Sequence, residues 1–376
     1  MNNIKKILII TLLTVINSSL IYSQEEDNVE EVVVISSKIP VPLSEVVGSV
    51  TLITQDDLEA RVVSDLGDIL ENTVGVSVPR NSQYGRYYNE GISIRGLGGS
   101  RVNIFVDGVR VSDAYAGYGR DVVEVDLLKR VEILKGPTSA LYGSDGLAGA
   151  VSYVTKDASD FTESGFHYSA RYSHFSDSDQ EKYSFLSAYV GERVEGILQF
   201  TNKNSSEMNL HDDAVQNPNP VRSEGESILG KFTFDLNDNI DITFTLDSQE
   251  WTSDIVVLTD IGSTFYPGLS TLSTTSSSVG ADEGSRERIG LRVDFKGQNN
   301  LFDNGTFNLF SQSTDQQQIT NKMVADMVFG QFGPMGPPTP GMLFRDFQFN
   351  QSVSGMALEL RKSYDNFNGR DVVYGF

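Results

Sequence analysis

Beyond residue 164 the chain alternates hydrophobic and polar residues with a period of two, the pattern of β-strands that have one apolar face. The clearest hairpin sets 228–236 against 240–246 across a short turn at 237–239. Its hydrophobic positions are Ile228, Gly230, Phe232, Phe234, Leu236, Ile240, Ile242, Phe244 and Leu246. Its polar positions are Lys231, Thr233, Asp235, Asp241, Thr243 and Asp247. Similar alternation over 165–173 and 194–200 leads us to expect about nine or ten antiparallel strands after residue 160.

Apolar residues outward and charged residues inward are typical of a transmembrane β-barrel. A soluble sandwich with one wet face gives the same periodicity, so the pattern alone leaves both open. After the N-terminus the sequence contains no long uninterrupted apolar stretch, so any membrane insertion would have to use strands closed into a barrel. Long polar stretches at 205–224 and 259–285 are predicted to be external loops, and the proline-rich segment 330–341 is predicted to lie inside a third, more apolar one.

The first part of the chain has a different, mixed pattern. We expect a strand over 48–54, a helix that Thr54 caps, a second short helix over 64–70 and a strand over 73–78. Two hydrophobic segments with glycine-rich corners follow, at 92–111 and 131–156. Glycine at such density is needed where the backbone turns at positive φ or approaches other backbone closely. The sequence therefore predicts a small α+β domain before the strands.

The glycine runs could also indicate a phosphate-binding loop. The run at 96–101 lacks the third glycine of a dinucleotide fingerprint, and the run at 143–146 is not followed by Gly-Lys-Ser/Thr. Neither run opens a helix of useful length. Nucleotide binding is therefore disfavoured.

The N-terminus has the features of a cleaved secretory signal. Lys5 and Lys6 precede an apolar core at 7–16 that is too short to span a bilayer, and we expect cleavage after Ser23. A polar, acidic stretch follows, and then a β-branched run over 31–36. Such a run beside an unstructured tail is a strand available to a partner's edge, or else the first strand of the domain that follows.

Composition excludes several classes of function. Fifty-one acidic against 29 basic residues give a net charge of −22, which argues against a nucleic-acid partner. The absence of cysteine excludes disulfides, iron–sulfur clusters and a cysteine nucleophile, and three histidines make a histidine-rich metal site unfavourable. No catalytic residues or metal ligands stand out, so we expect no enzyme.

The two glycine-rich segments, 92–111 and 131–156, occur in order and resemble both plug signatures of the TonB-dependent outer-membrane receptor family; the resemblance covers about 31–156. It implies an α+β plug followed by an antiparallel transmembrane β-barrel. The expected domains are a signal peptide (1–23), a TonB box and linker (24–45), a plug domain (46–158) and the N-terminal portion of the barrel (159–376). Barrels that hold a plug have about 22 strands, so we expect a partial barrel, by truncation of the sequence or as a short natural product.

The resemblance also implies a function: active uptake across the outer membrane of a Gram-negative bacterium, with TonB, the inner-membrane energy coupler, and outer-membrane lipid as partners. The implied ligand is a small iron-bearing molecule, haem or a ferric siderophore, or a haemoprotein, with no permanently bound cofactor. The second segment is most similar to the haem/haemoglobin branch, but the loop after 106–108 has tyrosines where that branch commonly has histidine. The alternatives are a binding-only receptor or adhesin, or uptake of a glycan, cobalamin or peptide.

Three sets of site residues follow from the resemblance. The TonB-binding residues would be Glu31, Val32, Val33, Val34, Ile35 and Ser36. The ligand-binding residues, at the plug apices, would be Tyr84, Arg86, Tyr87, Tyr88, Tyr115, Tyr118 and Arg120. The tyrosines could instead pack on the barrel or on each other. The plug–barrel contacts would be Arg95, Glu132 and Lys135, for which ordinary surface pairing is the alternative.

Overall fold

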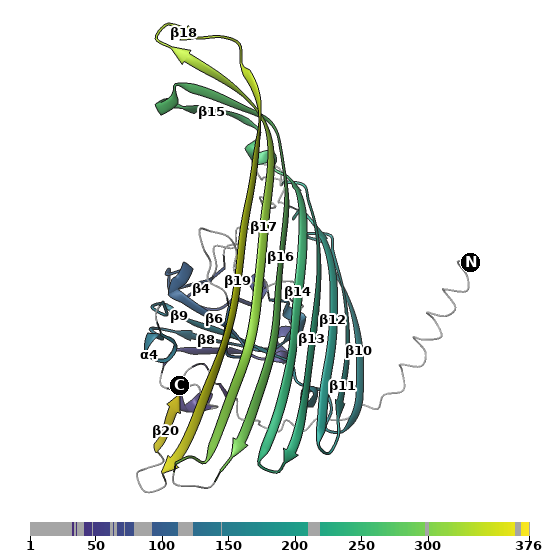
Figure 1. The fold of residues 1–376 in the computed structure, drawn as a ribbon. Helices are drawn as coiled ribbons and strands as arrows, with labels where there is room; N and C mark the ends of the chain where they lie inside the picture. The colour runs from purple at the N-terminus through teal and green to yellow at the C-terminus, as the bar shows by residue number, and fades with distance from the viewer. Residues whose placement is uncertain are drawn as a thin grey trace, which may run out of the picture.

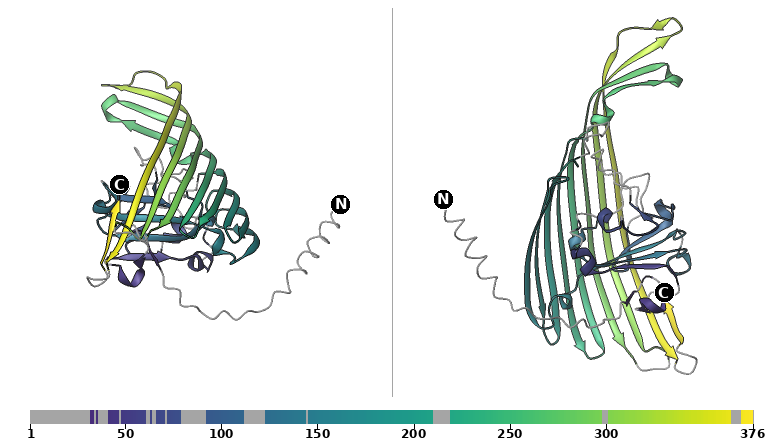
Figure 2. Two further views of the ribbon diagram at one scale, coloured as in Figure 1. Left: turned by 60° about the horizontal axis from the view of Figure 1, so that its bottom comes forward. Right: turned by 180° about the vertical axis from the view of Figure 1, so that it is seen from behind.

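The computed structural model describes residues 32–33, 35, 41–46, 48–60, 63, 66–70, 72–78, 92–111, 123–143, 145–209, 219–297, 301–364 and 370–375. Two parts are visible: a tall, curved antiparallel sheet and a small mixed domain that lies against its concave face (Figure 1; Figure 2). We call the mixed domain the plug, after the resemblance, and the concave face of the sheet the wall. This is the predicted arrangement of an α+β plug followed by an antiparallel sheet.

The sheet consists of long strands, each hydrogen-bonded to the next in the chain. They are β10 (Gly165–Phe175), β11 (Gln180–Val190), β12 (Val194–Ser206), β13 (Val221–Asn237), β14 (Ile240–Val256), β16 (Thr271–Lys296), β17 (Asn304–Gly330), β19 (Thr339–Tyr364) and β20 (Arg370–Gly375). The short strands β15 (Gly262–Tyr266) and β18 (Gly333–Pro334) pair with β16 and β17 and bring the sheet to 11 strands. The predicted hairpin is confirmed as β13 and β14, with Phe232 opposite Phe244.

The two faces of the sheet differ in polarity as the alternation predicted. Large hydrophobic side chains on the convex face are exposed, including Phe166, Tyr168, Tyr172, Leu198, Phe232, Phe234, Phe244, Leu246 and Ile289. Polar and charged side chains on the wall are buried, including Lys182, Gln199, Lys231, Asp247, Arg286, Arg288, Gln312 and Thr314. Within the part of the chain that the structure describes, no helix is long and apolar enough to cross a membrane.

One of the predicted loops, 259–285, is largely strand, and for it the prediction was wrong. Over 259–285 the structure has two short 3₁₀ helices, η7 (Leu258–Asp260) and η8 (Pro267–Leu269), the strand β15, and then β16 from Thr271 onward. Over 330–341 the chain forms the tip of a hairpin between β17 and β19 that projects beyond the neighbouring strands (Figure 1). The segment 271–278 is serine- and threonine-rich on both faces, so no polarity alternation reveals the strand.

The plug is built on a five-stranded mixed sheet in the order β3–β8–β9–β6–β7, in which β6 and β9 are parallel. Its strands are β3 (Val50–Ile53), β8 (Leu128–Lys135), β9 (Gly149–Thr155), β6 (Val102–Val106) and β7 (Val109–Arg110). A separate pair joins β4 (Val76–Ser77) to β5 (Ser93–Ile94). The helices are α2 (Gln55–Ala60), α3 (Leu66–Leu70) and α4 (Ser139–Tyr142), with 3₁₀ turns η2 (Leu43–Glu45), η4 (Gly99–Arg101), η5 (Val125–Leu127) and η6 (Ala158–Asp160).

The N-terminal elements of the plug agree with the sequence. The predicted strand over 48–54 is β3, and the Thr54 hydroxyl accepts a hydrogen bond from the Asp57 amide (3.3 Å) at the start of α2, as the cap predicted. Close backbone approach explains Gly149, because a Cβ there would lie 2.2 Å from the Leu134 carbonyl oxygen of the adjacent strand. The plug core includes Ile69, Leu70, Ile94, Val131 and Ile133.

Candidate functional site

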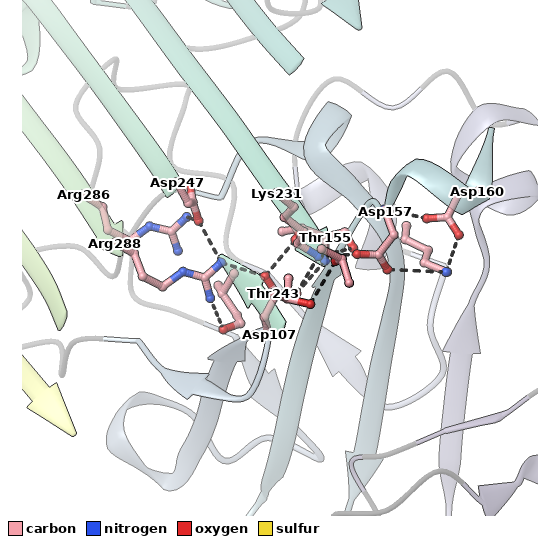
Figure 3. A network of polar contacts seen from close by, with 12 residues as sticks. Asp107, Thr155, Asp157, Asp160, Lys231, Thr243, Asp247, Arg286 and Arg288 are labelled. Carbon is pink, nitrogen blue, oxygen red and sulfur yellow. Dashed lines mark hydrogen bonds and ion pairs between the residues drawn. The ribbon is translucent and has the colours of Figure 1, made fainter. Parts of the chain in front are cut away.

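The most charged part of the structure is the contact between the plug and the wall, centred on Asp107 (Figure 3). Asp107 occupies the tight turn between β6 and β7 with a positive φ of 48°. Its carboxylate accepts hydrogen bonds from Arg288 Nη2 (2.7 Å), Thr155 Oγ1 (2.7 Å) and the Thr155 amide (2.9 Å). Arg288 also donates to the carbonyl oxygen of Val106 (2.6 Å). One arginine of the wall therefore binds both the backbone and the side chain of this turn.

A second carboxylate, on the wall itself, positions that arginine. Asp247 of β14 has no exposed side-chain surface and accepts a hydrogen bond from Arg286 Nη2 at 2.8 Å. Its Oδ2 atom also lies 3.3 Å from Arg288 Nη2. Because Arg286 and Arg288 follow each other on the inward face of β16, Asp247 pairs with both and points Arg288 at the plug (Figure 3).

Lys231 of β13 makes the next contact along the wall. Its ammonium group donates to Asp157 Oδ1 (2.9 Å) and to the Thr155 carbonyl oxygen (3.1 Å), and it lies 4.0 Å from Asp107 Oδ1. Asp157 is the N-cap of η6, at the end of the plug, and shares a capping box with Asp160. Lys231 thus joins the turn at Asp107 to the last turn of the plug.

A separate cluster lies at η5, where the plug meets β11 and β12. Glu124 Oε2 is 2.7 Å from Lys203 Nζ, and the ammonium group of Lys182 lies 3.4 Å from Glu124 and 3.2 Å from Asp126. Lys182 is only 2% exposed. Gln199 donates to the Asp126 carbonyl oxygen (2.8 Å). Acidic groups of the plug therefore face basic groups of the wall here too.

The carboxylates of Asp107 and Glu124 are ionised at neutral pH. Burial by itself raises the pKa of Asp107, but the charges of Lys231 and Arg288 outweigh it and hold that pKa well below its ordinary value. Burial also raises the pKa of Glu124, but the positive charges of Lys203 and Lys182 outweigh this effect and lower the pKa to about 2. The plug–wall contact is therefore a set of formed ion pairs, largely removed from water.

The predicted TonB-binding segment is in part held by the plug. Val32 and Val33 form β1, which pairs with β2 (Val41–Pro42). Ile35 is buried, its amide donates to Glu132 Oε2 (2.8 Å), and its carbonyl oxygen accepts from the Tyr142 hydroxyl (2.9 Å). The other three residues of that prediction, Glu31, Val34 and Ser36, lie outside the described residues.

Tyr142 is suited to its role as donor. Burial first, and then the nearby Glu132 carboxylate, raise the pKa of its hydroxyl above the ordinary value, so the proton that bonds Ile35 is retained. The Tyr142 ring also packs on Phe105, with 4.6 Å between ring centroids. The side chain of Ile35 lies in the same small cluster, with Phe105 and Ala150.

The residues predicted to contact the barrel lie on the plug as follows. Arg95 is exposed. Lys135 donates to the Val74 carbonyl oxygen (3.2 Å). Glu132 is fully buried inside the plug, where it accepts from Arg130 Nε (2.8 Å) as well as from Ile35. Their contact with a barrel wall stays a prediction.

The predicted ligand-binding residues all lie outside the described part of the chain: Tyr84, Arg86, Tyr87, Tyr88, Tyr115, Tyr118 and Arg120. Their role stays a prediction. The sequence reasoning missed Glu124, Asp126, Lys182, Lys203 and Arg288. Lys231 and Asp247 were recognised as inward-facing from the period of two, and the same period would have found Arg288 if 271–296 had been recognised as a strand.

Comparisons with known proteins agree with this arrangement. A family model described as TonB-dependent receptor plug domain matches residues 42–150. The vitamin B12 transporter BtuB of Vibrio vulnificus (strain CMCP6) is 35% identical over 137 residues, which are 36% of this chain and 22% of that protein. The chain thus matches less than a quarter of the length of this curated relative.

Solved structures share the fold. The FpvAI–pyocin S2 complex aligns over 92% of this chain and 52% of its own, with a TM-score of 0.55 and 14% identity. The ferripyoverdine receptor of the outer membrane of Pseudomonas aeruginosa aligns over 95% of this chain and 55% of its own, with a TM-score of 0.52 and 13% identity. At these identities the likeness concerns the fold alone.

The structure defines a class of protein, a plug domain tied by buried ion pairs to one face of an antiparallel sheet. Residues 42–150 match the plug domain of TonB-dependent receptors.

Proposed function

We propose that this chain is the plug-bearing part of a transporter in the outer membrane of a Gram-negative bacterium, which takes up its ligand at the expense of energy delivered by TonB. The observation that carries the proposal is the buried set of ion pairs between plug and wall, in which Asp107, Glu124 and Asp157 each bind a cation of the sheet. The exposed apolar face of the sheet supports its placement in lipid.

Coupling to TonB would use the segment Glu31, Val32, Val33, Val34, Ile35 and Ser36. Strand addition relies on main-chain hydrogen bonds, and a β-branched run favours the extended backbone that it needs. The contacts of Ile35 with Glu132 and Tyr142 connect this segment to strand β8 and helix α4 of the plug. A pull on the segment would therefore act directly on the plug sheet.

The transported ligand we propose is an iron-containing molecule, haem or a ferric siderophore, bound by the apical residues Tyr84, Arg86, Tyr87, Tyr88, Tyr115, Tyr118 and Arg120. Tyrosinate is a known iron ligand, including of haem. The likeness of the plug to that of a vitamin B12 transporter favours cobalamin as a second candidate.

Growth measurements separate these ligands. A strain that lacks the gene would be compared with its parent under iron limitation, with haem, haemoglobin or individual ferric siderophores as the iron source, and in a cobalamin-dependent background with limiting cyanocobalamin. We expect loss of growth on one iron source only. Loss on cyanocobalamin alone would replace the iron ligand with cobalamin, and no loss on any source would contradict the proposal.

The energy-coupling step needs a separate test in the full-length receptor. Val33→Pro removes a main-chain donor from the predicted TonB-binding segment, whereas Val33→Thr keeps both the donor and the β-branched shape. We expect the proline variant to lose uptake while it still binds ligand at the cell surface, and the threonine variant to retain both. Normal uptake by the proline variant would contradict TonB coupling through this segment, and binding without uptake in the wild type would indicate a binding-only receptor.

A further inference from the structure

The wall binds the plug through ion pairs, and it also carries buried polar atoms that have no partner in the described structure. On strands β11, β12, β13 and β16, the cations Lys182, Lys203, Lys231 and Arg288 each pair with a plug carboxylate. On strands β16, β17 and β19, several buried polar atoms have no hydrogen-bond partner in the described structure. They are Nε and Nη1 of Arg286, Nε of Arg288, Oε1 of Gln312, Oγ1 of Thr314 and Oε1 of Gln351.

The unpartnered atoms form one cluster. Arg286 is directly opposite Thr314 on β17, Thr314 is directly opposite Gln351 on β19, and Gln312 is opposite Arg288. Residues directly opposite each other in an antiparallel sheet point to the same face. Arg288 binds the plug at Val106, so all of these side chains lie on the wall, beside the plug.

Burial of these polar atoms without hydrogen-bond partners destabilises the folded protein. Arg286 and Thr314 are each 2% exposed, and Gln312 is 3% exposed. Buried polar groups almost always have hydrogen-bond partners, and a buried group without one destabilises the protein. On these strands, three guanidinium nitrogens and three oxygen acceptors are left available together, a combination that a polar guest can satisfy and an apolar one cannot.

The charge of the cluster indicates which guest it favours. Arg286 shares its one carboxylate partner, Asp247, with Arg288, and the unpartnered oxygens of the same cluster belong to the neutral side chains of Gln312, Thr314 and Gln351. Two parallel N–H groups of a guanidinium match a carboxylate or a similar oxyanion. The neighbouring amide and hydroxyl oxygens would accept hydrogen bonds from hydroxyl or N–H groups of the same guest.

We propose that Arg286, Thr314, Gln312 and Gln351 form a docking site for an anionic, oxygen-bearing group of the transported ligand, which meets this side of the wall as it passes the plug. The ion pairs of Lys182, Lys203, Lys231 and Arg288 keep their side closed, so the passage runs along β17 and β19, with Arg286 at its border. The identification of the guest as the transported ligand rests on the proposed uptake function, whereas the anion-selective site does not.

The test uses single cysteines, since this sequence contains none. Thr314→Cys is compared with Thr201→Cys, a matched control: Thr201 also lies on the wall, is 1% exposed, and pairs with the Ser184 hydroxyl at 3.0 Å. The full-length receptor in intact cells is treated with an anionic and with a cationic methanethiosulfonate reagent. Gln351→Cys serves as a second reporter of the site should Thr314→Cys not assemble in the membrane.

We expect the anionic reagent to modify Thr314→Cys on the order of tenfold faster than Thr201→Cys and faster than the cationic reagent does. Adding Arg286→Gln should abolish the preference for the anionic reagent. Equal rates at the two positions, or a preference that survives Arg286→Gln, would overturn the site. Repeating the labelling in cells without TonB separates the proposals: unchanged rates there would contradict TonB-driven passage but not the site.

Discussion

Replacing Asp107 with asparagine removes the carboxylate that ties the plug to two strands of the wall. Asparagine keeps the shape, and its oxygen can still accept from the Thr155 amide. Its NH₂ group, however, would face Arg288 Nη2, which is now 2.7 Å from a carboxylate oxygen. Two donors then oppose each other, and Lys231 loses one of its two carboxylate neighbours.

The expected loss can be worked out from this geometry. Arg288 is 2% exposed, and removing one partner of a buried pair costs about 3–5 kcal/mol. Arg288 keeps Asp247 and the Val106 carbonyl oxygen as partners, so we expect the lower end, about 3 kcal/mol. A matched control is Glu224→Gln, which breaks an exposed ion pair with Arg222 at 3.0 Å and should cost less than about 1 kcal/mol.

The assay is urea unfolding of the purified receptor in detergent, followed by the fluorescence of Trp251, the only tryptophan in this sequence. Trp251 follows Gln249 by two positions on β14, and Gln249 accepts a hydrogen bond from the Glu124 amide of the plug (2.9 Å), so its emission should report release of the plug. A loss for Asp107→Asn no larger than that for Glu224→Gln would refute the reasoning.

Three further outcomes are expected. The folded-state pKa of Glu124 is lowered from 4.5 to about 2, so its stabilising contribution is complete above about pH 4.5 and is lost as the pH falls toward 2. The stability of the plug should therefore depend less on pH across this range in Glu124→Gln than in the wild type. Parallel curves of stability against pH for the two proteins would contradict this expectation. Gly149→Ala places a Cβ 2.2 Å from a carbonyl oxygen of β8 and should cost about 2 kcal/mol or more in urea unfolding; an unchanged midpoint would contradict the tight approach. Tyr142→Phe removes the hydrogen bond to Ile35, so it should raise the affinity of the receptor for the purified periplasmic domain of TonB by about 3- to 10-fold in a titration. The control Tyr172→Phe, on the convex face, should leave that affinity unchanged. Equal affinities of Tyr142→Phe and the wild type would contradict the role of this hydrogen bond.

The sequence was most informative where local physics decides the structure. Alternation with a period of two predicted the hairpin of β13 and β14 and its outward aromatic residues, because one face of the sheet is exposed and the other meets the plug. The Thr54 cap was predicted from side-chain chemistry within one turn of helix. Both signals depend on residues close together in the chain.

The parts that could not be predicted depend on long-range geometry. Asp107 and Arg288 are 181 positions apart, and their pairing depends on how deeply the plug sits in the barrel and at what rotation. Neither the depth nor the rotation of the plug can be inferred from the polarity pattern of the segments around these two residues. The strand β16 was missed for a different reason, since its first eight residues are polar on both faces and carry no alternation.

The contacts of Ile35 bear on how the proposed TonB partner would attach. A partner strand would pair with an edge of the segment that presents free main-chain N–H and C=O groups, those of Ile35 among them. At Ile35 both groups already bond plug side chains, Glu132 and Tyr142, and β1 just before it is already paired with β2. A partner strand along that edge therefore cannot simply add to the segment and must exchange with existing bonds. The strength of TonB binding is then set by the difference between two sets of hydrogen bonds, so substitutions in the plug can change it without touching the binding segment.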